Sequence, residues 1–154
     1  MNRISLAVFD SDNMLAFSTT KNASVDEDFS DPISCSLLPG DYHFVAVIHQ
    51  ANEDGEAAAA IASTSQATIT TSKMRKVFSV NQPVTIIADQ TNTVIIDLGS
   101  CITSKFQLKT TDDTPANVAS CEVILNPSSS ATAAYLFNPT TGFAAADDVT
   151  GMSV

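Results

Sequence analysis

Residues 36–49 have the sequence Ser-Leu-Leu-Pro-Gly-Asp-Tyr-His-Phe-Val-Ala-Val-Ile-His. Proline presets φ at the second position of a turn and glycine accepts the positive φ that follows, so residues 38–41 are typical of a type II turn. The segment after the turn is rich in aromatic and β-branched residues, which pack well on a half-buried sheet. We therefore predict a β-hairpin that joins strands over residues 33–38 and 42–50.

The composition of the chain also favours a β domain. Its 154 residues suit one domain with a substantial core, and its 44% hydrophobic content excludes global disorder. The longest apolar runs are far shorter than the roughly 20 residues that a membrane helix needs. Seven basic and seventeen acidic residues give a net charge of −10, which repels phosphate and excludes nucleic acid as a partner. Serine and threonine are frequent and most strong helix formers are scarce, so we expect an all-β fold.

Turn clusters separate short alternating segments along the chain, which is the pattern of a β-sandwich. Besides the hairpin strands, the predicted strands cover residues 3–9, 14–19, 67–71, 77–80, 84–88, 93–98, 102–110, 120–125 and 133–137. Residues 52–62 contain an alanine-rich run, for which we predict a short helical turn. The expected fold is an all-β sandwich of about seven to nine strands with one short helical segment.

Three cysteines, Cys35, Cys101 and Cys121, lie inside predicted strands or, for Cys101, directly before one, and they lack the spacing of a metal site. An unpaired buried cysteine behaves as a small hydrophobic residue. We therefore expect buried free thiols in preference to a disulfide or a reactive nucleophile. The cysteines neither require nor exclude an oxidising compartment.

Three features bear on metal binding. Residues 10–13, Asp-Ser-Asp-Asn, have the spacing that begins a calcium loop, but the later glycine and glutamate of that loop are missing, so a hairpin turn is expected. The acidic run at residues 26–31 is expected to be a solvated loop. His43 and His49 share one side of a strand but lie roughly 20 Å apart, too far to share an ion. We expect no metal site and no cofactor.

Catalytic motifs are equally scarce. No nucleophile-elbow pattern and no glycine-rich phosphate loop occur, and two histidines leave few general bases. We therefore expect no catalytic or cofactor-binding residues and no enzymatic activity. An enzyme stays open as a class, and convergence of carboxylates such as Asp97 and Glu122 would be its sign. A carbohydrate- or host-ligand-binding surface module is a further alternative, with a site in loops 20–32 and 50–66, although tryptophan is absent.

Four segments occur in an order that resembles a known family. They are ISLAVFDSD at residues 4–12, LPGDYHFVAV at 38–47, SKFQLKTTD at 104–112 and PANV at 115–118. Together they resemble the N-terminal domain of the fimbrillin-associated anchor and minor subunit family of type V pili from Bacteroides-like bacteria. The resemblance covers most of the chain up to about residue 142, so we assign residues 1–142 to the sandwich and residues 143–154 to a tail or the start of a second domain.

The resemblance implies a transthyretin-like Greek-key sandwich that is exported as an outer-membrane lipoprotein and anchors or terminates a fimbrial polymer. Its acylated cysteine and its signal are not among these 154 residues. The implied partners are fimbrial subunits joined by β-strand addition, in which an extended segment pairs with an open sheet edge. We expect the first strand, residues 3–9, to lie at or near such an edge and to close the core through Ile4, Leu6 and Val8.

Overall fold

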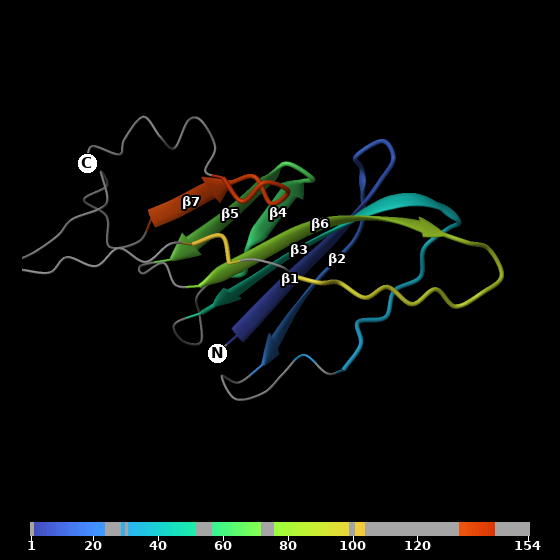
Figure 1. Cartoon of the computed structure of the whole chain (residues 1–154), viewed down its shortest axis with the longest axis horizontal. Coiled ribbons are helices and arrows are strands. Elements are labelled where there is room, and N and C mark those ends of the chain that lie inside the picture. Colours follow the sequence, from blue (N-terminus) through green and yellow to red (C-terminus); the bar gives the residue numbers. More distant parts are fainter. Residues whose placement is uncertain are drawn as a thin grey trace, which may run out of the picture.

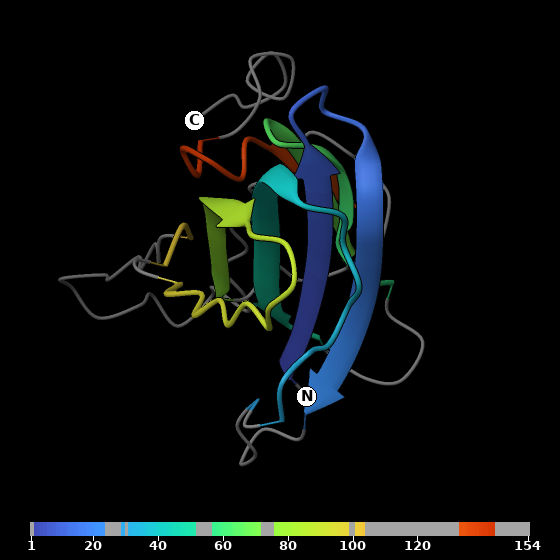
Figure 2. The same ribbon diagram turned by 90° about the vertical axis from the view of Figure 1, so that its right-hand side faces the viewer.

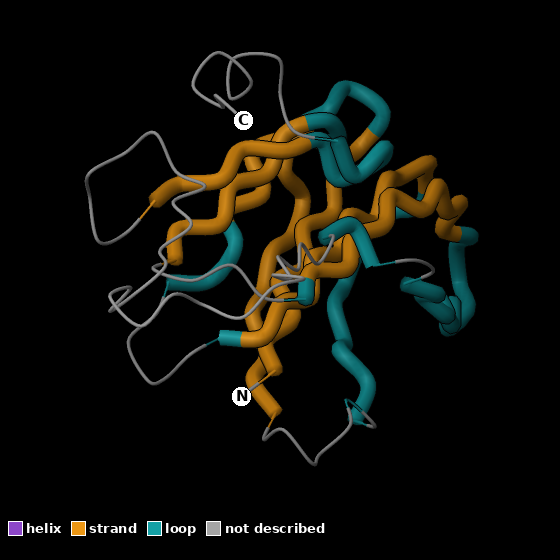
Figure 3. Tube along the Cα trace, turned by 60° about the vertical axis from the view of Figure 1, so that its left-hand side comes forward, coloured by secondary structure: helices purple, strands orange, loops and turns teal. Residues whose placement is uncertain are grey.

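The computed structural model describes residues 2–23, 29, 31–51, 57–71, 76–98, 101–103 and 133–143. Within these residues it has no helix and seven strands: β1 (Asn2–Asp10), β2 (Leu15–Ala23), β3 (Gly40–Gln50), β4 (Ala60–Ser63), β5 (Gln66–Thr71), β6 (Val77–Ile86) and β7 (Ala133–Phe137). All strand pairs are antiparallel and form two sheets (Figures 1 and 3). The expected all-β class is confirmed, and the two sheets are consistent with a β-sandwich. No described helix has the length and apolarity needed to cross a membrane.

Sheet A has four strands among the described residues, in the order β2-β1-β3-β6. Its two central strands are buried on both faces, because side chains of alternate parity on β1 and β3 enter different core clusters. Val8, Val45 and Val47 are fully buried, and each contributes about 1.5–3 kcal/mol relative to an exposed side chain.

The first strand was expected at or near a sheet edge. It lies next to the edge strand β2 but is not itself an edge. β1 pairs along its whole length with β3 and on its other side with β2, so that Leu6 lies opposite both Thr19 and Ala46. The backbone N–H and C=O groups on both sides of β1 are therefore paired in hydrogen-bond ladders. The expected role of Leu6 and Val8 in the core is confirmed, whereas Ile4 is only half-buried.

Sheet B has three strands in the part of the chain that the structure describes, in the order β4-β5-β7, and packs against one face of sheet A (Figure 1). Its inward residues Ala67, Ile69 and Phe137 join Val47 and Val77 of sheet A in one buried cluster. The alternation that predicted strands at residues 67–71 and 133–137 thus arises from one-sided burial.

The other face of sheet A is covered by two extended segments, residues 31–39 and 91–98, neither of which is a strand (Figure 2). Apolar side chains of both segments pack on the cluster around Leu6, Val8 and Phe44. These side chains are Ile33 and Leu37 from the first segment and Val94, Ile96 and Leu98 from the second.

The hairpin predicted around residues 38–41 is therefore wrong. β3 already pairs with β1 and β6, so it has no free edge for residues 33–38. Gly40 begins β3 with a φ of 156°, well away from the φ of about 80° that a type II turn requires. Instead, the Tyr42 hydroxyl donates a hydrogen bond of 2.9 Å to the carbonyl of Leu38, as in the tyrosine corner of immunoglobulin-like sandwiches.

Two strands predicted on either side of Pro83 form a single strand, β6. Proline lacks a backbone N–H and cannot donate to a neighbouring strand. This is tolerated on an edge strand because one of its sides has no neighbouring strand to pair with. β6 is such an edge strand. It pairs with β3 on one side, and on its other side the only backbone pairing among the described residues is an isolated bridge between Phe78 and Cys101.

The predicted helical turn at residues 52–62 is wrong wherever the structure describes it. Residues 57–59 are not helical and Ala60 begins β4, while residues 52–56 lie outside the described residues. Ala59 is buried and Ile61 packs against two core clusters, so tertiary packing overrides the helix propensity of the alanines. The strand predicted at residues 120–125 and most of the strand at 102–110 also lie outside the described residues.

Candidate functional site: a groove beside β4

The two sheets differ in width. Within the described residues sheet B has three strands and sheet A has four. Sheet B is anchored over β6, where the Ser79 hydroxyl donates to the carbonyl of Pro139 at 2.9 Å and the Asn81 amide donates to Thr140 Oγ1 at 2.9 Å. At the opposite side β4 reaches β1 and makes its main contact there through Ile61. No described strand covers the face of β2 that lies on the sheet B side of sheet A.

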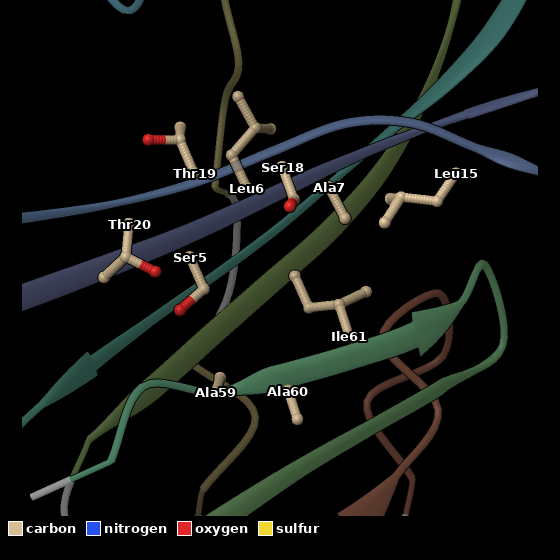
Figure 4. A pocket seen from close by; sticks show the side chains of 10 residues that line it. All are labelled: Ser5, Leu6, Ala7, Leu15, Ser18, Thr19, Thr20, Ala59, Ala60 and Ile61. Carbon is tan, nitrogen blue, oxygen red and sulfur yellow. The ribbon is translucent and has the colours of Figure 1, made fainter.

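The uncovered face of β2 and the neighbouring edge of β4 enclose a groove of about 250 Å³ (Figure 4). We call it the β4 groove. It is lined by Ser5, Leu6, Ala7, Leu15, Ser18, Thr19, Thr20, Ala59, Ala60 and Ile61. In Figure 4 the side chains of Ser5, Ser18 and Thr20 point from sheet A toward β4, whereas those of Leu6 and Thr19 point away.

The β4 groove is uncharged. None of its lining residues is ionisable, although the chain has a net charge of −10. Its floor consists of small side chains, and the polar side chains in its lining, Ser5, Ser18, Thr19 and Thr20, all carry hydroxyl groups. Such a surface offers hydrogen bonds and apolar contact, but it offers no general base and no metal ligand set.

One hydroxyl of the β4 groove is buried without compensation. Ser5 is only 3% exposed, and its Oγ has no hydrogen-bond partner within the part of the chain that the structure describes. An unsatisfied buried hydroxyl costs about 1–3 kcal/mol, so it is uncommon in a finished interior. The Ser5 side chain points toward β4 in Figure 4.

The wall of the β4 groove is the outer edge of β4. β4 pairs with β5 on one side, through Ala60 with Thr68 and Ile61 with Ala67. On the other side it has no partner strand among the described residues. An edge of this kind presents backbone N–H and C=O groups to an incoming strand.

Arg3 lies one alternate position beyond Ser5 on the same face of β1. It is 7% exposed, it stands opposite His49 on β3, and its Nε donates a hydrogen bond of 2.8 Å to Asn22 Oδ1 on β2. Alternation along the strand predicted at residues 3–9 puts Arg3, Ser5 and Ala7 on one side, but the sequence did not indicate that this side is buried like the other. The polar residues in an otherwise apolar alternation were the only available signal.

The candidate metal features lead to no cluster. Asp10 Oδ1 accepts the backbone N–H groups of Asp12 and Met14 at 3.0 and 2.9 Å, which is the expected hairpin turn. His43 Nδ1 donates to Asn81 Oδ1 at 3.0 Å, and His49 is buried elsewhere on β3. Within the described ranges no three His, Cys, Asp or Glu residues converge on one point.

The acidic run and the carboxylate pair are described only in part. Asp31 is exposed and lies 3.7 Å from Lys21 in an ion pair, while residues 26–28 lie outside the described residues. Asp97 is exposed at the surface, and Glu122 lies outside the described residues.

The prediction of buried cysteines is wrong for Cys35 and Cys101, both of which are exposed, and Cys121 lies outside the described residues. The physical reason is that residues 33–38 and 101–103 do not form paired strands. Burial would raise the pKa of the Cys101 thiol, but its hydrogen bonds with Thr103, a backbone bond to Val77 and the charge of Lys76 together lower that pKa. Its Sγ lies 3.2 Å from Thr103 Oγ1.

Comparison with known proteins adds no relative: no family model, no curated protein and no solved structure matches the chain.

Proposed function

We propose that the chain is a non-catalytic structural subunit of a cell-surface fimbria, an anchor or minor subunit that supports adhesion. It joins other subunits through the edges of its sheets. The observation that carries the proposal is the width difference between the sheets. Among the described residues it leaves β4 with an open edge beside a face of β2 that no strand covers.

The family resemblance of residues 4–12 and 38–47 supports the fimbrial part of the proposal, and with it a transthyretin-like Greek-key topology. The hydrogen bond from Tyr42 to Leu38 is in keeping with such a sandwich, because a tyrosine at this place fixes a connection that enters a strand. Attachment to the outer membrane through a lipid anchor and assembly with fimbrial subunits belong to the same proposal.

The central position of β1 bears on how a partner can join the subunit. A strand held by ladders on both sides costs far more to displace than an edge strand, because both sets of hydrogen bonds and a two-sided core are lost. The proposed subunit therefore keeps β1 and accepts a partner at another edge.

A carbohydrate-binding module is less well supported. Sugar rings commonly stack on exposed aromatic side chains, and the β4 groove has no aromatic residue in its lining.

The proposal is tested by deleting the gene in its host and by examining fractionated cells with an antibody to the chain. We expect the chain in the outer-membrane fraction, and we expect the deletion strain to have fimbriae that are altered in length or released into the medium. A chain confined to the cytoplasm, or fimbriae and adhesion unchanged by the deletion, would contradict the proposal.

A further inference from the structure

We propose that the β4 groove receives an uncharged extended segment of another polypeptide, with aliphatic side chains at alternate positions. The segment adds to β4 as the next strand of sheet B and covers Ser18 and Thr20 of β2. The inference rests on the proposed function, because it specifies which edge of the sandwich joins a partner and what that partner presents.

The geometry of the two layers determines the place of the segment. Packed sheets lie about 10 Å apart and neighbouring strands about 4.8 Å apart, so one strand added beside β4 would lie over β2. The sheet order within the described residues gives β4 no other neighbour on that side. An extended backbone is the ligand that can satisfy this edge, since it offers N–H and C=O groups at the same repeat.

The floor of the β4 groove determines how large the inward-pointing side chains of the added segment must be. Ser5, Ala7, Ser18 and Thr20 are too short to fill the space between two sheets. Bulky aliphatic side chains on the added strand would fill it, and they would also cover Leu15, which is 55% exposed. In a strand these side chains recur at every second position.

The absence of charge in the lining determines the polarity of the segment. An ionised side chain in the β4 groove would lose water without gaining an opposite charge, which is costly. Hydroxyl or amide groups could instead bond to Ser5 Oγ, which is buried and has no hydrogen-bond partner within the described residues. The proposed partner is thus neutral over the length of the groove.

The test uses the full chain, labelled with ¹⁵N, and the probe peptide Lys-Thr-Val-Thr-Ile-Thr-Val-Lys. We expect saturable shifts of the amide signals of β4 and of Ser18 and Thr20 on β2. A control peptide with proline in place of isoleucine removes a backbone donor and should bind about tenfold more weakly or worse. No saturable binding, or shifts confined to β6, would overturn the inference.

Two matched variants locate the binding. Thr20→Trp fills the β4 groove, whereas Thr70→Trp makes the same change at an exposed position of β5 on the outer face of sheet B. We expect Thr20→Trp to lower the affinity for the probe at least about tenfold and Thr70→Trp to leave it unchanged. Equal affinities of the two variants would overturn the inference.

Ser5→Ala tests the buried hydroxyl. Removal of one hydrogen bond to the bound segment should weaken binding about five- to tenfold while the free protein stays folded. If the peptide binds in the β4 groove but deletion of the gene leaves the fimbriae unchanged, the proposed function fails and the strand site stands. If the fimbriae change but the peptide does not bind, the inference fails and the proposed function stands.

Discussion

The two faces of sheet A are covered in different ways. One face packs against sheet B, whose described strands are held in ladders, and the other packs against residues 31–39 and 91–98, which form none. Both coverings bury apolar side chains of β1 and β3. The comparison shows that a segment can bury the apolar side chains of a sheet without pairing its own backbone in a ladder. We expect the ladder-free face to be the softer one, because only side-chain contacts and few hydrogen bonds hold its covering in place.

The strongest test compares one substitution on the two faces. Phe9 is 2% exposed and faces sheet B, and Phe44 is 6% exposed and faces the two segments. We expect Phe9→Ala to lower the free energy of unfolding by about 3–5 kcal/mol, because paired strands cannot collapse into the cavity. Phe44→Ala should cost about 2–3 kcal/mol, because unpaired segments can move inward.

Urea denaturation followed by circular dichroism measures both values. Nearly equal losses at Phe9 and Phe44 would show that the covering segments are as rigid as sheet B.

The next effect concerns a covering segment itself. Ile96 packs on the Phe44 cluster, whereas its neighbour Ile95 is 82% exposed. We expect Ile96→Ala to cost about 1–2 kcal/mol, since its side chain is only half-buried, and Ile95→Ala to cost less than about 0.5 kcal/mol. Thermal melts of the two variants measure the difference. Similar melting temperatures would contradict the assigned orientation of residues 93–98.

A smaller effect is expected at the hydrogen bond that fixes the other segment. Tyr42→Phe removes the donor to the Leu38 carbonyl and should cost about 1 kcal/mol. Hydrogen exchange should accelerate at residues 33–39 and stay slow within β3. Unchanged exchange at residues 33–39 would show that apolar packing of Ile33 and Leu37 alone holds the segment.

The smallest expected effect concerns the reactivity of Cys101, which forms an isolated bridge with Phe78 of β6. The lowered pKa of Cys101 means that a larger thiolate fraction exists near pH 7.5 than for an ordinary thiol, so alkylation by iodoacetamide is faster there. Thr103→Val removes the side-chain hydrogen bond and should slow alkylation of Cys101 several-fold near pH 7.5. The difference should narrow as the pH rises above about 9, because both thiols are then ionised.

Peptide mapping of the alkylated chain measures the rate at Cys101 separately from the other cysteines. A rate that Thr103→Val leaves unchanged at every pH would contradict the role given to the Thr103 hydroxyl.

The sequence predicted the strands whose burial follows a simple pattern. Residues 3–9, 42–50 and 67–71 have the β-branched and aromatic composition of strands, and they are strands in the structure. Composition and alternation report that a segment is extended and packed. They do not report which backbone edge it meets, and residues 33–38 show the difference, because β3 has no edge left for them.

The β4 groove could not be predicted for a related reason. It depends on the relative widths of two sheets, which follow from pairing rather than from any local motif. The alanines before Ile61 indicated a helix, but pairing with β5 and the packing of Ile61 on Ala7 and Phe9 make that segment a strand. Ser5 carried a weak signal as a polar residue within an apolar run, but its meaning required the position of β4.

The central place of β1 has a consequence for biosynthesis. Leu6 acquires its neighbour Ala46 only after some forty further residues have left the ribosome, and the ladder of β3 then waits for Val80 on β6. Native contacts that join such distant parts of a chain make folding slow, on the order of milliseconds to seconds. The nascent polypeptide therefore stays open for a long interval, which makes holding chaperones useful during that interval.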